Sequence, residues 1–268
     1  MAFVGQVDEM GIDGTPVCTG DLSGMERTMN SVCVATYNGE AYIAQQLRSI
    51  LAQIAPDDEV IVSDDGSTDQ TLKIVDSIGD KRVRVRHSKA RYFRDNFVEA
   101  MQESKGKLIF LSDQDDVWLP GKYKRCVEEL KTADLVCTNS QMTDADLKVI
   151  EPSFFSVYHS GAGVLKNAMN NTYYGACMAF RHSLLDKALP MPPTREIGHD
   201  LWLGLVAEMT GTVRFIDTPY LLYRRHDETA TVTTGLLLRS KRPLWQKIWS
   251  RFVVLYHVCK FRCNRAKQ

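Results

Sequence analysis

The chain has 268 residues, 44% of them hydrophobic, which is enough for the core of one large α/β domain. Its 33 basic and 33 acidic residues balance, but no acid follows Glu228, so the body of the chain is acidic and nucleic acid is excluded as an expected partner. The basic residues of the carboxyl end are Arg239, Lys241, Arg242, Lys247, Arg251, Lys260, Arg262, Arg265 and Lys267.

Residues 1–29 show no hydrophobic periodicity, and we expect a poorly ordered tail. A regular alternation then begins, with strands expected at 31–35, 60–62, 83–85 and 108–111 and helices at 43–54, 72–78, 97–104 and 123–130. This βα alternation predicts a doubly wound, mostly parallel α/β sheet with helices on both faces, in a domain spanning 30–235. Ligands of such sheets bind beyond the carboxyl ends of the strands.

The second half of the domain is less regular. Residues 173–180 are expected to form a strand in which Gly175 marks a close approach of the backbone. A helix is expected to open at Gly198-His199-Asp200. Residues 236–268 are predicted to contain a basic amphipathic helix.

Acidic side chains follow two of the expected strands. The tetrad Asp113-Gln114-Asp115-Asp116 comes after 108–111, and the turn 63–69, with Asp64 and Asp65, comes after 59–62. At about 4 Å and an effective dielectric near 20, each carboxylate pair of an exposed tetrad costs roughly 4 kcal/mol, and a divalent ion reverses the sign. Solvated acidic loops are the alternative for either segment alone. Together they predict a metal and diphosphate site at one sheet edge.

A set of short motifs occurs in a fixed order along the chain. Its members are 31–39, 64–69, the tetrad with Trp118 and Pro120, the Gly175 segment, 199–202 and 223–226. Each is weak alone, but the ordered set is specific, covers about residues 30–230 and resembles the inverting family 2 glycosyltransferases of GT-A fold. The sequences Asp-Gln-Asp-Asp-Val-Trp and His-Asp-x-Trp are most similar to those of bacterial rhamnosyltransferases that build capsule or O-antigen polysaccharide.

The resemblance implies a nucleotide and metal site. Asp65, together with Asp64, would accept hydrogen bonds from the pyrimidine and ribose. Asp116 would be the direct ligand of Mn²⁺ or Mg²⁺, with Asp115 beside it on the nucleotide side. The remaining assignments are Thr36, Tyr37 and Asn38 around the base, Asp113 near the metal, His226 completing the metal site, and Arg224 or Arg225 on phosphate oxygens. For His226 the alternative is a surface histidine in a charged loop.

Asp200 matches the position of the family's catalytic base. Inverting transfer needs a carboxylate that takes the proton of the acceptor hydroxyl, an assistance worth about 10²- to 10⁴-fold. The residue before this aspartate is His199, whereas the family usually has Glu at that position. The alternative for Asp200 is a stabilising residue in the first turn of a helix.

A further group is expected to contact donor or acceptor sugar. Arg91 and Arg94 occupy the place of a donor loop in relatives, with a solvated helix start as the alternative. Trp202 could stack on a sugar, whereas core packing is favoured at least equally for Trp118. Gly175, His199 and Asp113 complete the group.

The carboxyl-terminal segment carries the stripe Leu244, Ile248, Phe252 and Leu255 with two tryptophans beside it. An apolar stripe with Trp, flanked by Lys247 and Arg251, suits an anionic membrane surface. Packing back on the domain is the alternative.

The cysteines and the amino-terminal residues bear on localisation. The seven cysteines form no Cys-x-x-Cys pair, and no signal peptide is evident. We therefore expect a cytoplasmic protein, located at the cytoplasmic face of the inner membrane if the carboxyl-terminal helix binds membrane.

The expected function is a metal-dependent inverting glycosyltransferase that moves L-rhamnose from dTDP-rhamnose to a polysaccharide precursor. One alternative keeps the fold and uses a UDP-hexose or UDP-N-acetylhexosamine. Another, of a different class, is a non-catalytic protein that binds a nucleotide sugar. The expected partners are the nucleotide-sugar donor and a saccharide acceptor. A lipid-linked acceptor would accord with a carboxyl-terminal helix that binds membrane.

Overall fold

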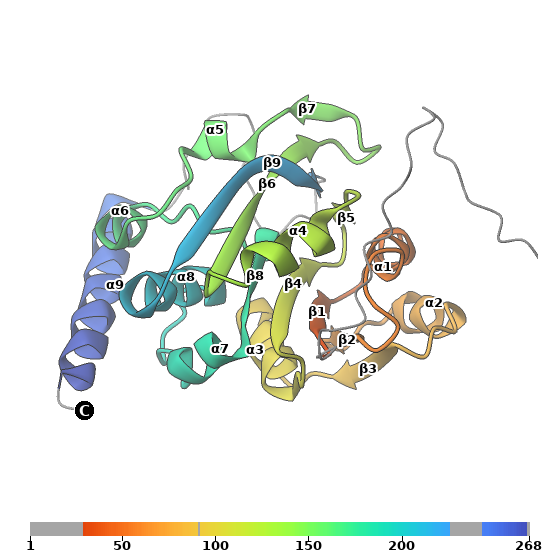
Figure 1. Ribbon diagram of the computed structural model, residues 1–268, viewed down its shortest axis with the longest axis horizontal. Coiled ribbons are helices and arrows are strands. Elements are labelled where there is room, and N and C mark those ends of the chain that lie inside the picture. The colour runs from red at the N-terminus through yellow and green to blue at the C-terminus, as the bar shows by residue number, and fades with distance from the viewer. Residues whose placement is uncertain (1–28, 91, 226–242, 267–268) are drawn as a thin grey trace, which may run out of the picture.

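A computed structural model describes residues 29–90, 92–225 and 243–266 (Figure 1). All of the expected tail except Met29 lies outside them, as do Arg91 and His226. The described residues form a mixed sheet with helices on both faces, which confirms the predicted α/β class.

The first half of the sheet is parallel and carries the predicted edge. Its strands are β1 (Ser31–Thr36), β2 (Glu59–Asp64), β3 (Val83–His87) and β4 (Leu108–Asp113), in the spatial order β3-β2-β1-β4. Thr36 pairs with Asp64, and Ala35 pairs with Asp113. The register therefore brings the carboxyl ends of β1, β2 and β4 to one level.

The second half extends the sheet with both strand directions. The antiparallel strand β8 (Met178–Arg181) joins β4 to β6 (Leu135–Thr143), and the long strand β9 (Val213–Arg224) runs parallel to β6. Two short antiparallel strands, β5 (Val117–Trp118) and β7 (Val149–Glu151), pair with β9 and β6. Since β9 ends at Arg224, it returns the chain to the acidic tetrad.

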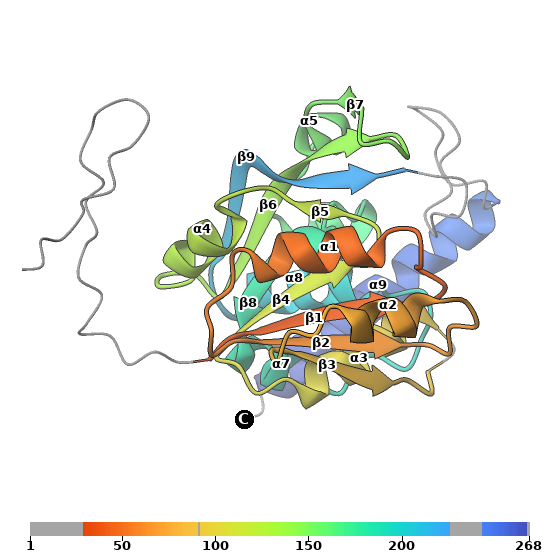
Figure 2. The ribbon, with the colours of Figure 1, turned by 90° about the vertical axis from the view of Figure 1, so that its right-hand side faces the viewer.

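Each face of the sheet has its own core, because side chains alternate along every strand. Val32 and Val34 face α1 (Ile43–Leu51), α2 (Thr71–Ser77) and α4 (Lys122–Glu129), whereas Cys33 faces the opposite layer. That layer consists of α3 (Phe93–Glu103), α7 (His182–Ala188) and α8 (His199–Thr210). Figure 2 shows α1 lying along the sheet on one side. The predicted helices are confirmed, with bounds shifted by a few residues.

One expected strand is partly wrong. Residues 173–180 contain the 3₁₀ turn η1 (Gly175–Cys177), and strand pairing begins only at Met178. Within this turn the Ala176 carbonyl accepts a hydrogen bond from the buried Lys122 Nζ at 2.6 Å. This turn carries Tyr174 and Gly175 into the edge of the sheet where the acidic loops lie.

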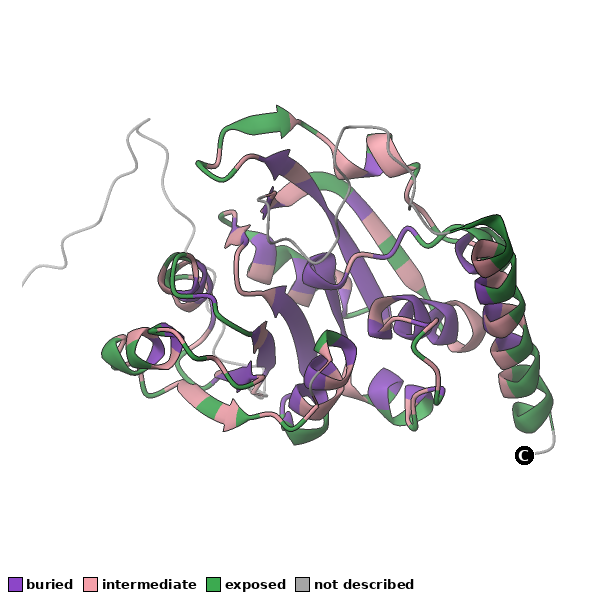
Figure 3. Ribbon diagram, turned by 180° about the vertical axis from the view of Figure 1, so that it is seen from behind, coloured by how far each residue is buried: buried purple, intermediate pink, exposed green. Residues whose placement is uncertain are grey.

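Helix α9 (Leu244–Arg265) packs beside α8 and the short helix α6 (Val164–Met169), with α5 (Phe154–Tyr158) above them (Figure 1). It buries Ser250, Val254 and Val258 rather than the expected apolar stripe. Ser250, the neighbour of the basic residue Arg251, faces the domain. Packing on the domain is thus observed, yet Leu244, Ile248 and Phe252 of the stripe remain exposed, whereas Leu255 is half-buried against the core. Figure 3 shows exposed positions along the outer side of α9.

Candidate active site

The loops after β1, β2 and β4 are tied together by side chains. The Thr36 hydroxyl and the Tyr37 amide both donate to Gln114 Oε1, at 2.6 and 2.8 Å. The Asn38 amide donates to Ser67 Oγ at 2.9 Å, and Asn38 adopts a left-handed φ of 47°. The residues predicted around the nucleotide therefore come together from three strand ends.

Members of this group differ in what they offer a ligand. Asp64 is buried and accepts hydrogen bonds from its own turn, including the amides of Gly66 and Ser67. Thr36 is also buried, with its hydroxyl bonded to Gln114. Tyr37 and Asn38 are exposed and Asp65 is half-buried, so these three are best placed to contact a nucleotide.

Two acids of the tetrad share one tyrosine. The Tyr174 hydroxyl lies 2.9 Å from Asp113 Oδ2 and 3.4 Å from Asp116 Oδ2. Burial, followed by the charge of Asp115, raises the pKa of Asp113 to about 7, and the same causes raise the pKa of Asp116 well above its usual range. The expectation of an exposed strand end is wrong for Asp116, which is fully buried and accepts the Arg224 amide at 3.1 Å.

The acidic cluster fits a hard divalent cation. Its donors are carboxylate oxygens, which suit Mg²⁺ and Mn²⁺, and a cation would relieve the repulsion that raises these pKa values. Within residues 29–90, 92–225 and 243–266, no three His, Cys, Asp or Glu side chains converge as a complete metal centre. Asp115 and Asp116 would therefore need a further ligand, and His226 lies outside the described residues.

Arg224 does not extend freely toward a phosphate. Its guanidinium donates to the Asp115 carbonyl at 2.8 Å and to Gln45 Oε1 at 2.6 Å, and it stacks over Tyr42. These contacts hold the tetrad backbone against α1. Arg225 is half-buried beside it and remains the phosphate candidate of the pair.

Asp200 stands in the first turn of α8, as the sequence predicts. Its Oδ1 accepts the Leu201 amide at 2.7 Å, and Asn171 Nδ2 lies 3.4 Å from its Oδ2. The charge of Asp200 contributes to the raised pKa of Asp113. The candidate base also lies beside the turn that follows Tyr174, because a Cβ added at Gly175 would lie 3.9 Å from the Asp200 Cβ.

His199 is buried next to this base. Its ring stacks on Phe97 with centroids 4.4 Å apart, and neither ring nitrogen has a hydrogen-bond partner in the described part of the chain. Burial lowers the pKa of His199, which keeps the imidazole neutral near neutral pH. A Cβ at Gly175 would lie 2.9 Å from His199 Nε2, so the predicted close approach at Gly175 is confirmed, with the imidazole as its cause.

Gly175→Ala should destabilise the protein by about 1–3 kcal/mol, because the added methyl overlaps a buried ring that has little room to move. Chemical denaturation of the variant measures this loss. The same change in a His199→Ala background should be much milder, since the overlap is then absent. Equal losses in both backgrounds would contradict the contact.

Trp202 and Arg94, both predicted to contact sugar, are buried in the protein. Trp202 is in the core, where its Nε1 donates to the Ala188 carbonyl at 2.9 Å and its ring meets Phe261 of α9. Arg94 is buried and donates to the carbonyls of Pro192 and Ile197, which brace the loop before α8. Apolar neighbours around Trp202 and the enclosing loop around Arg94 account for both differences. Arg91 lies outside the described residues.

Two residues of this region were not predicted from the sequence. Tyr174 bridges Asp113 and Asp116, and Lys122 lies fully buried over the Trp118 ring while holding the Ala176 carbonyl. Desolvation lowers the pKa of Lys122, which the charges of nearby acids oppose. A lysine at a helix start is ordinarily solvated, so no sequence signal distinguishes it.

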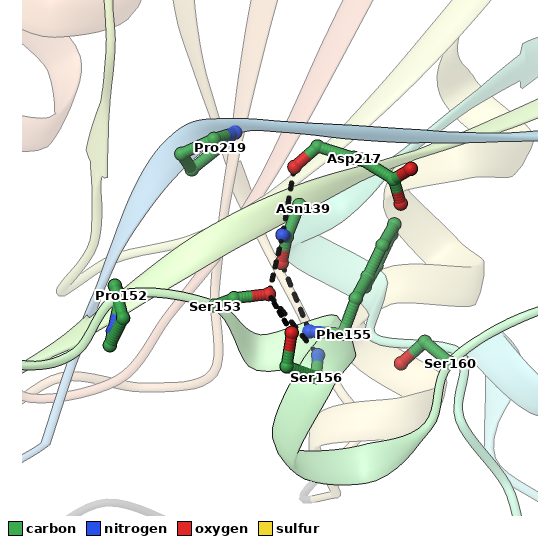
Figure 4. Close-up of a pocket in the computed structure, with 8 residues that line it drawn as sticks. All are labelled: Asn139, Pro152, Ser153, Phe155, Ser156, Ser160, Asp217 and Pro219. Carbon is green, nitrogen blue, oxygen red and sulfur yellow. Dashed lines mark hydrogen bonds between the residues drawn. The ribbon is translucent and has the colours of Figure 1, made fainter.

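A separate hollow of about 390 Å³ lies between α5 and β9 (Figure 4). Ser153, Ser156 and Asp217 line it, with the Phe155 ring at one side. The preceding residue, Phe154, instead stacks on Tyr174 with ring centroids 5.5 Å apart. Helix α5 therefore separates this hollow from the acidic cluster.

Comparison with known proteins agrees with this architecture. The model of glycosyl transferase family 2 matches residues 31–189. An uncharacterized glycosyltransferase of Nostoc sp. is 25% identical over 73% of this chain and 64% of its own length. The dTDP-rhamnosyl transferase RfbG of Shigella flexneri is 32% identical over 41% of this chain and 40% of its own length.

A crystal structure of S. aureus TarS in complex with UDP-GlcNAc shares the fold, with a TM-score of 0.60 at 22% identity over 74% of this chain and 59% of that chain. This chain spans less than two thirds of the length of all three relatives. The extent of the family match shows that the chain belongs to glycosyl transferase family 2, and its fold is of the GT-A type.

Proposed function

We propose that this protein transfers a sugar from a nucleotide-sugar donor to an acceptor hydroxyl with inversion at the anomeric carbon. The observation that carries the proposal is the position of Asp200 against Gly175, where an added Cβ would lie 3.9 Å from the Asp200 Cβ. The residue before Gly175 is Tyr174, whose hydroxyl lies 2.9 Å from Asp113 Oδ2 on the acidic edge. Asp200 takes the proton of the acceptor hydroxyl as that oxygen attacks. Tyr37, Asn38 and Asp65 contact the nucleotide, and Arg225 pairs with its phosphates.

The acidic cluster is proposed to hold Mn²⁺ or Mg²⁺ through Asp115 and Asp116, with His226 completing the set. Such an ion stabilises the charge that develops on a leaving diphosphate. The Tyr174 hydroxyl and the Arg224 amide both donate hydrogen bonds to the Asp116 carboxylate and so hold it in place. Neighbouring Asp113 adds negative charge that favours a cation.

The proposed donor is dTDP-rhamnose. Support comes from the likeness to a dTDP-rhamnosyl transferase and from the wording of the tetrad and of the His199-Asp200 motif. A UDP-hexose or UDP-N-acetylhexosamine is the second candidate, favoured by the shared fold with a protein that binds UDP-GlcNAc. A non-catalytic binding protein would have no need of a carboxylate at Asp200.

The proposed acceptor is a precursor of capsule or O-antigen polysaccharide, elongated at the cytoplasmic face of the inner membrane. None of the helices in the described ranges is long and apolar enough to span a bilayer.

A donor panel tests the proposal directly. We expect dTDP-rhamnose with Mn²⁺ or Mg²⁺ to stabilise the protein by about 2.7 kcal/mol at 100 times its dissociation constant, and to be hydrolysed slowly without acceptor. Thermal melting and release of nucleoside diphosphate measure both effects. Stronger effects with UDP-sugars would move the assignment to the second donor class, and binding without hydrolysis or transfer would favour the non-catalytic alternative.

A further inference from the structure

Helices α6 and α9 leave an unusually apolar surface. Six large side chains of α9 point outward, with exposed fractions from 51% for Ile248 to 73% for Leu244. On α6, Leu165 and Met169 are exposed beside them. Soluble monomers rarely expose so continuous an apolar patch unless it binds something. The remaining members on α9 are Trp245, Trp249, Phe252 and Tyr256.

This surface is hollowed between the two helices. A groove of about 330 Å³ has an almost wholly apolar lining that includes Met169, Leu244, Ile248 and Phe252. Arg251 closes one side, because its Nε donates to the Met169 carbonyl at 2.9 Å and so ties α9 to the end of α6. The groove is therefore formed by α6 and α9 together and not by α9 alone.

Both charged side chains among the described residues that line the groove are positive. Lys247 and Arg251 line it, and Lys166 is exposed on α6 next to Leu165. No acid follows Glu228 in the sequence, so α9 has no negative side chain to offset them. Association of two copies through this face would bring like charges together, whereas an anionic bilayer would neutralise them.

The groove is also close to the candidate base. Met169 lines the groove, and Asn171, two residues further along the chain, contacts Asp200. Figure 3 shows α6 at the upper end of α9, with exposed positions along the outer side of that helix. A molecule anchored at the groove would thus be held near the edge where transfer is proposed.

We propose that α6 and the amino-terminal half of α9 form a docking surface for an anionic phospholipid bilayer. The aromatic side chains enter the interface, the groove accepts apolar chains, and the basic residues contact phosphate headgroups. The consequence for substrate class rests on the proposed function: the acceptor is a lipid-anchored saccharide presented from the bilayer toward Asp200.

Vesicle flotation of the full chain tests the proposal. Wild type should bind phosphatidylcholine vesicles that contain phosphatidylglycerol and bind pure phosphatidylcholine much more weakly. The double variant Ile248→Ser, Phe252→Ser should bind at least about tenfold more weakly, as should Lys247→Glu, with the latter difference shrinking at high salt. Ile150→Ser, which removes a comparably exposed apolar side chain on β7, is the matched control and should bind as wild type.

Donor hydrolysis measured without acceptor or lipid separates this proposal from the proposed function, and it should be unchanged in all of these variants. Equal binding of wild type and the double variant to anionic vesicles would overturn the docking surface. So would a wild-type dimer that becomes monomeric in the double variant while neither protein binds vesicles. Absence of donor hydrolysis in wild type would instead count against the glycosyltransferase proposal.

Discussion

Asp200→Asn should lower single-turnover transfer by at least about 10²-fold while the free energy of unfolding changes by well under 1 kcal/mol. The amide keeps the size of the side chain and an oxygen that accepts the Leu201 amide, so the first turn of α8 should persist. It cannot take a proton from the acceptor hydroxyl. Nucleotide affinity should survive, because Tyr37, Asn38 and Asp65 lie at the other strand ends.

Parallel measurements of melting, nucleotide affinity and single-turnover transfer distinguish the base from a helix-start residue. Asp186→Asn on α7 removes a charge from an exposed aspartate and should leave all three unchanged. Near-wild-type turnover of the Asp200→Asn protein, with a stability loss confined to Asp200→Ala, would remove Asp200 from the mechanism.

Asp116→Asn should abolish the response of the protein to Mn²⁺ or Mg²⁺ and lower transfer by at least about 10²-fold, since charge stabilisation by a metal is worth several kcal/mol. The fold should survive, because the amide oxygen can still accept the Arg224 amide. Melting with and without each ion, in the presence of dTDP, measures the response.

Asp116→Ala is the informative companion of that variant. Because Asp116 is fully buried, the truncation leaves the Arg224 amide without its acceptor and should cost about 1–3 kcal/mol of stability in addition. An ion-dependent shift in melting that is as large in Asp116→Asn as in wild type would place the metal elsewhere.

Much of the candidate site follows from local pattern. Buried strands such as 31–36 and 108–113 are apolar on both faces and end in polar turns, so their parallel pairing and their common edge are readable from residue order. Helix starts are equally local, and Asp200 lies in the first turn of α8 as the motif predicts.

Side-chain environments were not readable in this way. Arg224, Arg94 and Trp202 are residue types that often contact phosphates or sugars, yet here their polar groups are used by carbonyls from distant segments. Tyr174 contacts Asp113 and Asp116, and Lys122 bonds the Ala176 carbonyl, at the place where η1 interrupts the expected strand. Such contacts join residues up to about a hundred positions apart, and a local pattern contains no information on them.

The sequence by itself determined the α/β class and the edge at which the carboxylates gather, because both depend on short-range periodicity and on strand direction. The candidate base was implied by the resemblance of its motif to a known family. Tertiary structure alone decided which carboxylates are buried, why position 175 must be glycine and which side of α9 faces out. The physical reason is that burial and pKa depend on the desolvation produced by elements packed from elsewhere in the chain. In α9, Val254 and Val258 pack against the domain, and Trp245 and Trp249 are therefore exposed to solvent.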